Sequence, residues 1–137
     1  MKITQEADYA LRIILFLCQT SSEQRIEARV ISETQNIPLR FSLKILRKLT
    51  KKNLVKSFRG VNGGYMINKN SKDITLKEVV EAIDGPIYVN RCLYDKEYCN
   101  RRKTNKCTIH QALANVQKVV HQELQKVTFE DLLKEKE

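Results

Sequence analysis

Apolar residues recur with helical spacing in the first third of the chain. From Glu6 to Cys18 they occupy every third or fourth position, the pattern of an amphipathic helix. A second, shorter helix is expected after Ile26, with Ala28 and Ile31 facing inward. Asn36 follows it, and asparagine tolerates the left-handed conformation that a tight turn between two helices needs.

Pro38 suits the start of a further helix, because proline is favoured in the first turn. Four apolar residues of this helix are expected to face inward: Phe41, Ile45, Leu46 and Leu49. Two short helices around a short turn predict a helix-turn-helix, a motif whose second helix reads the major groove of DNA.

The periodicity changes after Asn53. Residues 54–67 read as two β-strands around a glycine-rich tip. Gly60, Gly63 and Gly64 are three of only four glycines in the chain, which indicates positive φ or a close backbone approach there. A β-hairpin directly after a helix-turn-helix is a wing.

The second half predicts one further helix of the domain and a long C-terminal helix. Thr75 and Glu78 have capping-box spacing, and Thr108 with Gln111 is another capping-box candidate. No period holds between residues 88 and 107, so this segment is expected to be a loop. The long helix carries apolar residues in near-heptad spacing: Ile109, Leu113, Val116 and Val120. So much apolar surface in a small chain favours a partner helix, and a two-fold homodimer is the commonest arrangement.

These elements predict a mainly α fold with a small β wing. We expect a winged helix-turn-helix over residues 1–85, a cysteine-rich loop over 86–107, and a dimerisation helix with a tail over 108–137. No apolar run approaches the roughly 20 residues that span a membrane, and no signal-peptide pattern opens the chain. A cytoplasmic protein without membrane contact is therefore expected.

Positive charge is concentrated in the first half. The formal net charge is +9, and residues 37–59 hold eight basic residues and no acidic one. Such a one-sided field attracts polyanions, so we expect double-stranded DNA as partner. The candidate DNA-binding residues are Arg40, Ser42, Lys44, Arg47, Lys48, Lys51, Lys52 and Arg59. Of these, Arg40, Ser42 and Lys44 are expected near base edges and the other basic residues near phosphates.

Three of the four cysteines lie in the aperiodic loop. Cys18 falls on the apolar stripe of the first helix and is expected to be a small buried hydrophobe. Cys92, Cys99, Cys107 and His110 follow the spacing C-x6-C-x7-C-x2-H, with five basic and two acidic residues in the segment. Positive charge nearby favours thiolates, the form that binds metals.

Two kinds of metal site are compatible with this loop. Structural zinc usually relies on tight C-x2–4-C knuckles, which are absent here. An iron–sulfur cluster accepts thiolates at longer spacings, so it is modestly favoured. A redox enzyme is not expected, because the chain has no C-x-x-C pair and no nucleotide-binding motif.

The sequence resembles the IscR/NsrR-type family of bacterial winged-helix iron–sulfur transcription regulators. The resemblance covers nearly the whole chain and rests on the three loop cysteines and on residues 1–4, 8–13, 31–38, 46–49, 54–65 and 76–85. It implies a homodimeric transcription regulator, a repressor of a palindromic operator, that senses iron–sulfur status, redox state or nitric oxide. The alternative is a zinc-stabilised or cofactor-free winged-helix repressor.

The resemblance also implies one cluster per protomer, bound by Cys92, Cys99 and Cys107. In IscR-like members the fourth ligand is a histidine that matches His110, with a 2Fe–2S cluster. In NsrR-like members it is an aspartate from the partner's first helix that matches Asp8, with a 4Fe–4S cluster. The spacings of six and seven residues exceed the five and five of IscR-like members. Together with the resemblance this difference favours Asp8, and both assignments remain open.

Overall fold

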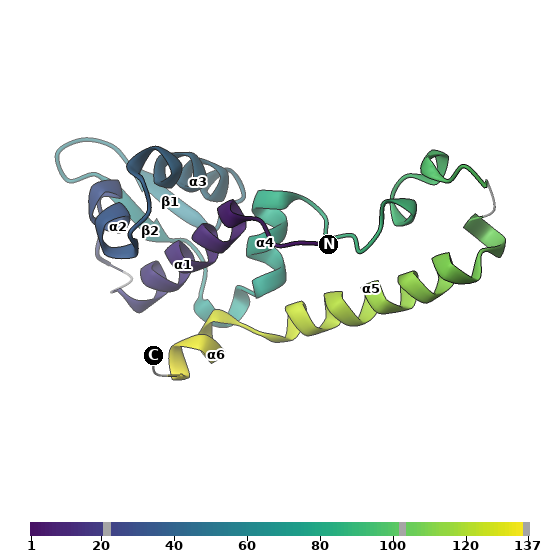
Figure 1. Cartoon of the computed structure of the whole chain (residues 1–137). Helices are drawn as coiled ribbons and strands as arrows, with labels where there is room; N and C mark the ends of the chain where they lie inside the picture. The colour runs from purple at the N-terminus through teal and green to yellow at the C-terminus, as the bar shows by residue number, and fades with distance from the viewer. Residues whose placement is uncertain (21–22, 102–103, 136–137) are drawn as a thin grey trace.

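A computed structural model describes residues 1–20, 23–101 and 104–135 of the chain. A winged-helix body forms one end, and one long helix projects from it as an arm (Figure 1). The main elements in chain order are α1 (Gln5–Gln19), α2 (Ala28–Gln35), α3 (Leu39–Lys51), β1 (Val55–Phe58), β2 (Gly64–Ile67), α4 (Leu76–Asp84), α5 (Thr108–Lys126) and α6 (Phe129–Lys134). Mainly helical with a two-stranded wing, the fold is the predicted one.

The helix-turn-helix forms from α2 and α3. Asn36 adopts the expected left-handed conformation, with φ of 54°, and ends α2. Three of the four residues expected on the inner face of α3 are fully buried: Ile45, Leu46 and Leu49.

The prediction for Phe41 is wrong. Its side chain is 51% exposed, whereas Ser42 beside it is 0% exposed. At about 100° per residue, Ser42 points along the centre of the buried face and Phe41 about a quarter turn away from it. The apolar character of Phe41 misled the sequence reading because helix geometry, and not residue type, decides which side faces the core.

The wing is an antiparallel hairpin of β1 and β2. Val55 pairs with Ile67 and Phe58 with Gly64, and an isolated bridge from Ile26 to Tyr65 adds a third chain segment. Gly64 has φ of 144°, and a Cβ there would lie 2.8 Å from the carbonyl oxygen of Ile26. Only glycine tolerates both this positive φ and so close a backbone neighbour. The positive φ and close backbone approach predicted from the glycine cluster are therefore confirmed.

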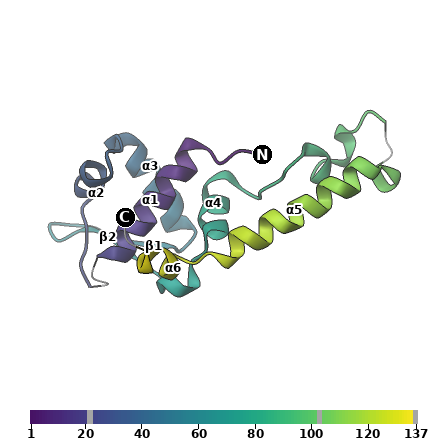
Figure 2. The same cartoon turned by 60° about the horizontal axis from the view of Figure 1, so that its bottom comes forward.

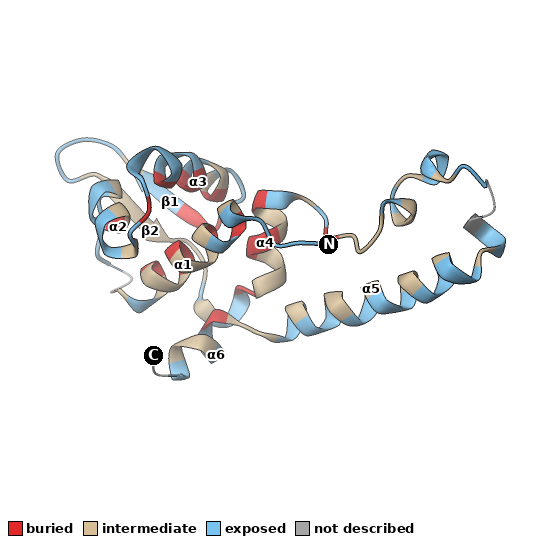
Figure 3. Ribbon diagram, viewed as in Figure 1, coloured by how far each residue is buried: buried red, intermediate tan, exposed pale blue. Residues whose placement is uncertain are grey.

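Helix α1 lies at the centre of the core. Five of its residues are buried, and it packs against α2, α3, α4 and α6. Figure 3 shows the buried residues gathered in the winged-helix body and the exposed ones dominating the arm. The core therefore belongs to the part of the molecule expected to bind DNA.

The C-terminal tail returns to this core. Phe129 is 0% exposed, and its N–H donates to the carbonyl oxygen of Ile74 at 2.9 Å. Leu76 donates in turn to the carbonyl oxygen of Val127 at 3.1 Å. Thr128 closes a capping box with Asp131 at the start of α6. In both views α6 lies against the body, where it packs on α1 and on the short turn Ser71–Asp73 (Figures 1 and 2). The sequence pattern indicated a tail after the long helix but gave no sign that it packs on the core.

Helix α5 has little support from the rest of the chain. None of its residues is buried in the described chain, and it contacts mainly α4 and the cysteine loop. Two polar contacts hold the start of that loop to the helix: the N–H of Val89 donates to Gln117 Oε1 at 3.1 Å, and His121 Nε2 lies 2.7 Å from the carbonyl oxygen of Ile87. Across the described residues, no helix is both long and apolar enough to cross a membrane.

Candidate DNA interface and cysteine-lined hollow

The exposed side of α3 carries a ridge of basic side chains. Arg40, Lys44, Arg47 and Lys51, here called the basic ridge, are all exposed and recur every three or four residues. They lie opposite the buried face, because this spacing returns to the same side of a helix. Lys52 caps the C-terminal end of α3 and is also exposed. The ridge can contact a phosphate backbone without any rearrangement of the core.

Two of the predicted DNA-binding residues differ from the rest. Ser42 is buried, so it is withdrawn from the residues expected at base edges. Lys48 lies closer to α1, where its Nζ is 2.8 Å from Glu6 Oε1. Lys44 Nζ is 3.9 Å from the other oxygen of the same carboxylate. Glu6 therefore neutralises part of the charge beside α3, which the sequence pattern did not indicate.

Arg59 is exposed at the edge of the wing, as predicted. Arg25 supports the wing from the segment before α2. Its guanidinium lies over the Phe58 ring at 3.8 Å from the centroid, and it donates to the carbonyl oxygen of Asn62 at 3.2 Å. These contacts orient the hairpin that carries Arg59. No spacing in the sequence links Arg25 to the wing.

The three loop cysteines and His110 line one surface hollow at the start of α5. The hollow has a volume of about 320 Å³. Its lining residues are Asn90, Cys92, Tyr98, Cys99, Asn100, Arg101, Cys107, Ile109 and His110. The structure thus brings together all four candidate ligands that lie in this segment.

Three contacts connect the hollow's sulfur and nitrogen atoms. Cys107, and not the expected Thr108, caps the N-terminus of α5, and its Sγ accepts from the backbone N–H of His110 at 3.5 Å. His110 Nδ1 lies 3.3 Å from Cys92 Sγ, so one proton can be shared between ring and thiol. Asn90 Nδ2 also donates to Cys92 Sγ, at 3.4 Å. Asn90 had no signal in the sequence pattern.

Arg91 organises the stretch between the first two cysteines. Its guanidinium pairs with Asp95 at 3.2 Å and lies 4.8 Å from the centroid of the Tyr98 ring. Tyr98 in turn lines the hollow. The loop is therefore folded by its own side chains, although it has no hydrophobic periodicity.

The donor set can be tested against the two kinds of metal site. Within the described residues, no three Cys, His, Asp or Glu side chains lie close enough together to hold one metal ion. A preformed tetrahedral zinc site is therefore not present in this part of the chain. An iron–sulfur cluster divides its four protein ligands among several iron ions, two per iron in a 2Fe–2S cluster and one per iron in a 4Fe–4S cluster, so its donors are spread around a cavity. Three thiols and an imidazole around one hollow fit that requirement.

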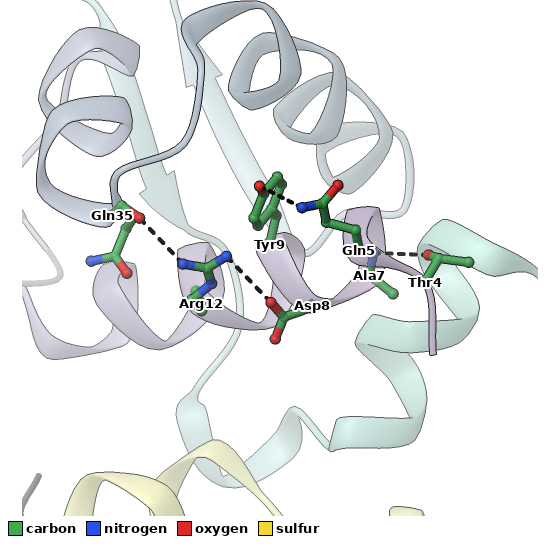
Figure 4. Close-up of polar contacts among 7 residues, drawn as sticks. All are labelled: Thr4, Gln5, Ala7, Asp8, Tyr9, Arg12 and Gln35. Atoms are coloured by element: carbon green, nitrogen blue, oxygen red, sulfur yellow. Dashed lines mark hydrogen bonds and ion pairs between the residues drawn. The ribbon is translucent and has the colours of Figure 1, made fainter. Parts of the chain in front are cut away.

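Asp8, the rival fourth ligand, lies elsewhere in the protomer. It is an exposed residue of α1 and pairs with Arg12 at 3.3 Å (Figure 4). Arg12 also donates to the carbonyl oxygen of Gln35, which joins this pair to the end of α2. The segment that lines the hollow lies beside the start of α5, on the arm, whereas α1 lies in the body, so one protomer does not bring Asp8 to the cysteines (Figures 1 and 2).

A family model described as an iron-dependent transcriptional regulator, Rrf2, matches residues 3–135. This chain belongs to the Rrf2 family. The regulator IscR of Pectobacterium atrosepticum is 29% identical to it over 137 residues, covering all of this chain and 82% of the relative. The solved structure of CymR, the global cysteine regulator of B. subtilis, has a TM-score of 0.77 at 26% identity and covers 96% of this chain and 95% of that one. T. potens IscR shares the fold, with a TM-score of 0.76 at 22% identity, and covers 98% and 87%.

Membership of the Rrf2 family makes this chain a transcription regulator with a DNA-binding winged helix, and not an enzyme. The basic ridge and Arg59 lie on the two elements, recognition helix and wing, with which such a fold contacts DNA. The hollow lies away from that surface, on the arm.

The fourth cysteine of this Rrf2 protein is separate from the hollow. Cys18 packs against the core from α1. Burial raises the pKa of its thiol from 9.0 to about 11. A thiol that remains protonated at neutral pH is a poor metal ligand, which agrees with the structural role predicted for it.

The predicted dimer seam lies on the exposed arm. Ile109 and Val116 are 62% and 51% exposed, and Leu113 and Val120 are half-buried. Val119, on a neighbouring face, is also exposed. The arm therefore presents apolar side chains that this protomer alone does not cover.

Proposed function

We propose that this chain is a cytoplasmic, homodimeric repressor that senses iron–sulfur status, redox state or nitric oxide through a cluster held in the hollow. Cys92, Cys99 and Cys107 are the thiolate ligands. The observation that carries the proposal is that these three thiols and one imidazole, far apart in a loop without hydrophobic periodicity, line the same hollow. Membership of a family of iron-dependent transcriptional regulators supports it.

His110 is our choice for the fourth ligand. Its ring already lies in the hollow, in contact with Cys92 Sγ, whereas Asp8 of the same protomer is paired with Arg12 on α1. An Asp8 that coordinates from a second copy is the alternative outcome. A 2Fe–2S cluster goes with His110 and a 4Fe–4S cluster with Asp8, as the family resemblance implies.

When bound, such a cluster supplies a centre that gains or loses electrons or is dismantled by oxidants. The chain's own residues connect that centre to the DNA-binding body. Cys107 and His110 belong to the first turn of α5, and Gln117 and His121 hold the loop against the helix. At its other end α5 leads into Val127, whose carbonyl oxygen accepts from the N–H of Leu76, and then into α6, which packs on the core.

The consequence is a mechanical connection from hollow to operator. When the cysteine loop becomes more or less ordered, its contacts with α5 change and the position of α5 changes with them. In a dimer paired through α5, this movement alters the distance between the two recognition helices. A coupling of about 1–3 kcal/mol is typical of such regulators and changes operator affinity about 5- to 150-fold.

Iron loading of cysteine variants tests the sensor. Cys92→Ala, Cys99→Ala and Cys107→Ala should each abolish stable iron binding in anaerobically purified protein, because two thiolates in an open hollow do not retain a cluster. Cys18→Ala is the matched control and should load iron as the parent does. Iron analysis and absorption spectra measure this. Full loading in all three variants would contradict the sensor while leaving the DNA-binding function intact.

A pair of variants identifies the fourth ligand. His110→Ala should change the absorption and electron paramagnetic resonance spectra and shift the reduction potential, whereas Asp8→Ala should leave both unchanged. The reverse result assigns the ligand to Asp8 of a second copy. In that case the spectrum should also depend on dimerisation.

A further inference from the structure

The N-terminal half of α3 exposes three large apolar side chains. Leu39, Phe41 and Leu43 are 38%, 51% and 41% exposed. None of them belongs to the core or to the partly buried residues that pack against it. Single exposed apolar residues are ordinary, but three within five positions of one helix form a surface that favours a partner.

These side chains flank the basic ridge. At about 100° per residue, Leu39 and Leu43 lie one turn apart along one side of the ridge, and Phe41 lies along the other side. The helix therefore presents positive charge in the middle with apolar groups on both sides. The three apolar side chains also lie in the N-terminal half of α3, and this is the part of a recognition helix that contacts base edges.

The charge of this surface indicates what occupies it. Residues 37–59 contain eight basic side chains and no acidic one, and Glu6 of α1 offsets only part of this charge. The occupant is therefore a polyanion that also offers apolar groups between its charges. Duplex DNA meets both conditions in its major groove. Phosphates border the groove, and the C5-methyl of thymine is the apolar group displayed on its floor.

We propose that Leu39, Phe41 and Leu43 contact thymine C5-methyl groups, so that this regulator selects operators in part by the methyl groups beside its basic ridge. The proposal rests on the DNA-binding function of the winged helix and is independent of the cysteine site. Burial of one methyl-sized group corresponds to about a fourfold change in affinity.

The test begins with an operator obtained experimentally. The full chain, purified anaerobically with and without iron, is used to enrich duplexes from a random DNA library. The enriched duplex is then resynthesised with deoxyuridine in place of thymidine, one position at a time. This change removes the methyl group and keeps the O4 acceptor and the base pairing. Affinity should fall about fourfold at the contacted positions and stay unchanged elsewhere.

Variants assign each methyl group to a side chain. Phe41→Ala and Leu43→Ala should each bind the thymidine duplex more weakly than the parent does. Each variant should also lose the deoxyuridine penalty, the fall in affinity on removal of a methyl group, at the thymine that the truncated side chain contacts. Phe41→Leu should keep part of the penalty. Val30→Ala, which shortens a 43% exposed apolar residue on α2, is the matched control and should keep every penalty. All three positions are exposed, and thermal unfolding of the four variants checks that the fold is retained.

The outcomes separate this proposal from the DNA-binding function. If no sequence is enriched, both fail. If a sequence is enriched but every deoxyuridine duplex binds like its parent, methyl recognition is overturned and DNA binding stands. If penalties appear but persist in Phe41→Ala and Leu43→Ala, the proposal is likewise overturned, because other residues then contact the methyl groups.

Discussion

Removing the Phe129 side chain tests whether the C-terminal segment is part of the winged-helix core. Phe129 is among the largest fully buried side chains, and it comes from the last helix of the chain. Truncating a buried phenylalanine to alanine typically costs about 3–5 kcal/mol, through lost transfer free energy and the remaining cavity. Typical domains have about 5–15 kcal/mol of stability in total, so the expected loss is large.

Phe129→Ala should therefore lower the free energy of unfolding in urea by about 3–5 kcal/mol. Because α6 has only six residues, part of the loss should appear as local undocking. Hydrogen exchange should then become faster at the amides of Leu76 and Phe129, which pair across this junction. Under the proposed coupling, undocking also releases the end of α5, so operator affinity should depend less on iron.

Glu130→Ala is the matched control, since Glu130 is the exposed neighbour of Phe129 on the same helix. It should change the free energy of unfolding by less than about 0.5 kcal/mol. An unfolding curve of Phe129→Ala that superimposes on that of the parent would refute the docking of α6. So would unchanged hydrogen exchange at the junction.

Three further predictions follow from individual contacts. The logarithm of DNA affinity falls linearly with the logarithm of salt concentration, and Lys51→Ala should reduce this slope by about 0.9. Lys48→Ala should reduce the slope less, because Glu6 already neutralises Lys48. Glu6→Gln should raise the affinity for DNA, and equal slopes for the two lysine variants would contradict the Glu6–Lys48 pair. With its pKa raised to about 11, Cys18 should resist alkylation at pH 8 until the protein unfolds, and mass spectrometry of native and urea-treated samples measures this. Val116→Asp should dissociate the proposed dimer into monomers, because it places a charge in the seam, and light scattering measures the mass. A folded, intact dimer would exclude that seam.

Local sequence patterns were sufficient for the elements of the winged helix. The left-handed Asn36 and the glycine-rich wing follow from what single residues and their neighbours can adopt. The inward positions Ile45, Leu46 and Leu49 follow from helical spacing. Such features depend on contacts within a few residues, which periodicity and turn chemistry report directly.

The candidate site was only partly accessible in this way. The spacing of three cysteines and a histidine indicated a metal site, and it named the residues that the fold brings around one hollow. The donors from Asn90 and the turn formed by Arg91 were not indicated, because the loop has no period from which its conformation can be read.

The order and type of the elements, the basic surface of α3 and the candidate ligands follow from the pattern of residues along the chain. Three features follow from packing instead: Phe129 completes the core, Glu6 pairs with Lys48, and Ser42 rather than Phe41 lies inside. Each of these depends on how one element is rotated against another distant in the chain. Packing between elements sets that rotation, and no local pattern of hydrophobic and polar residues contains it.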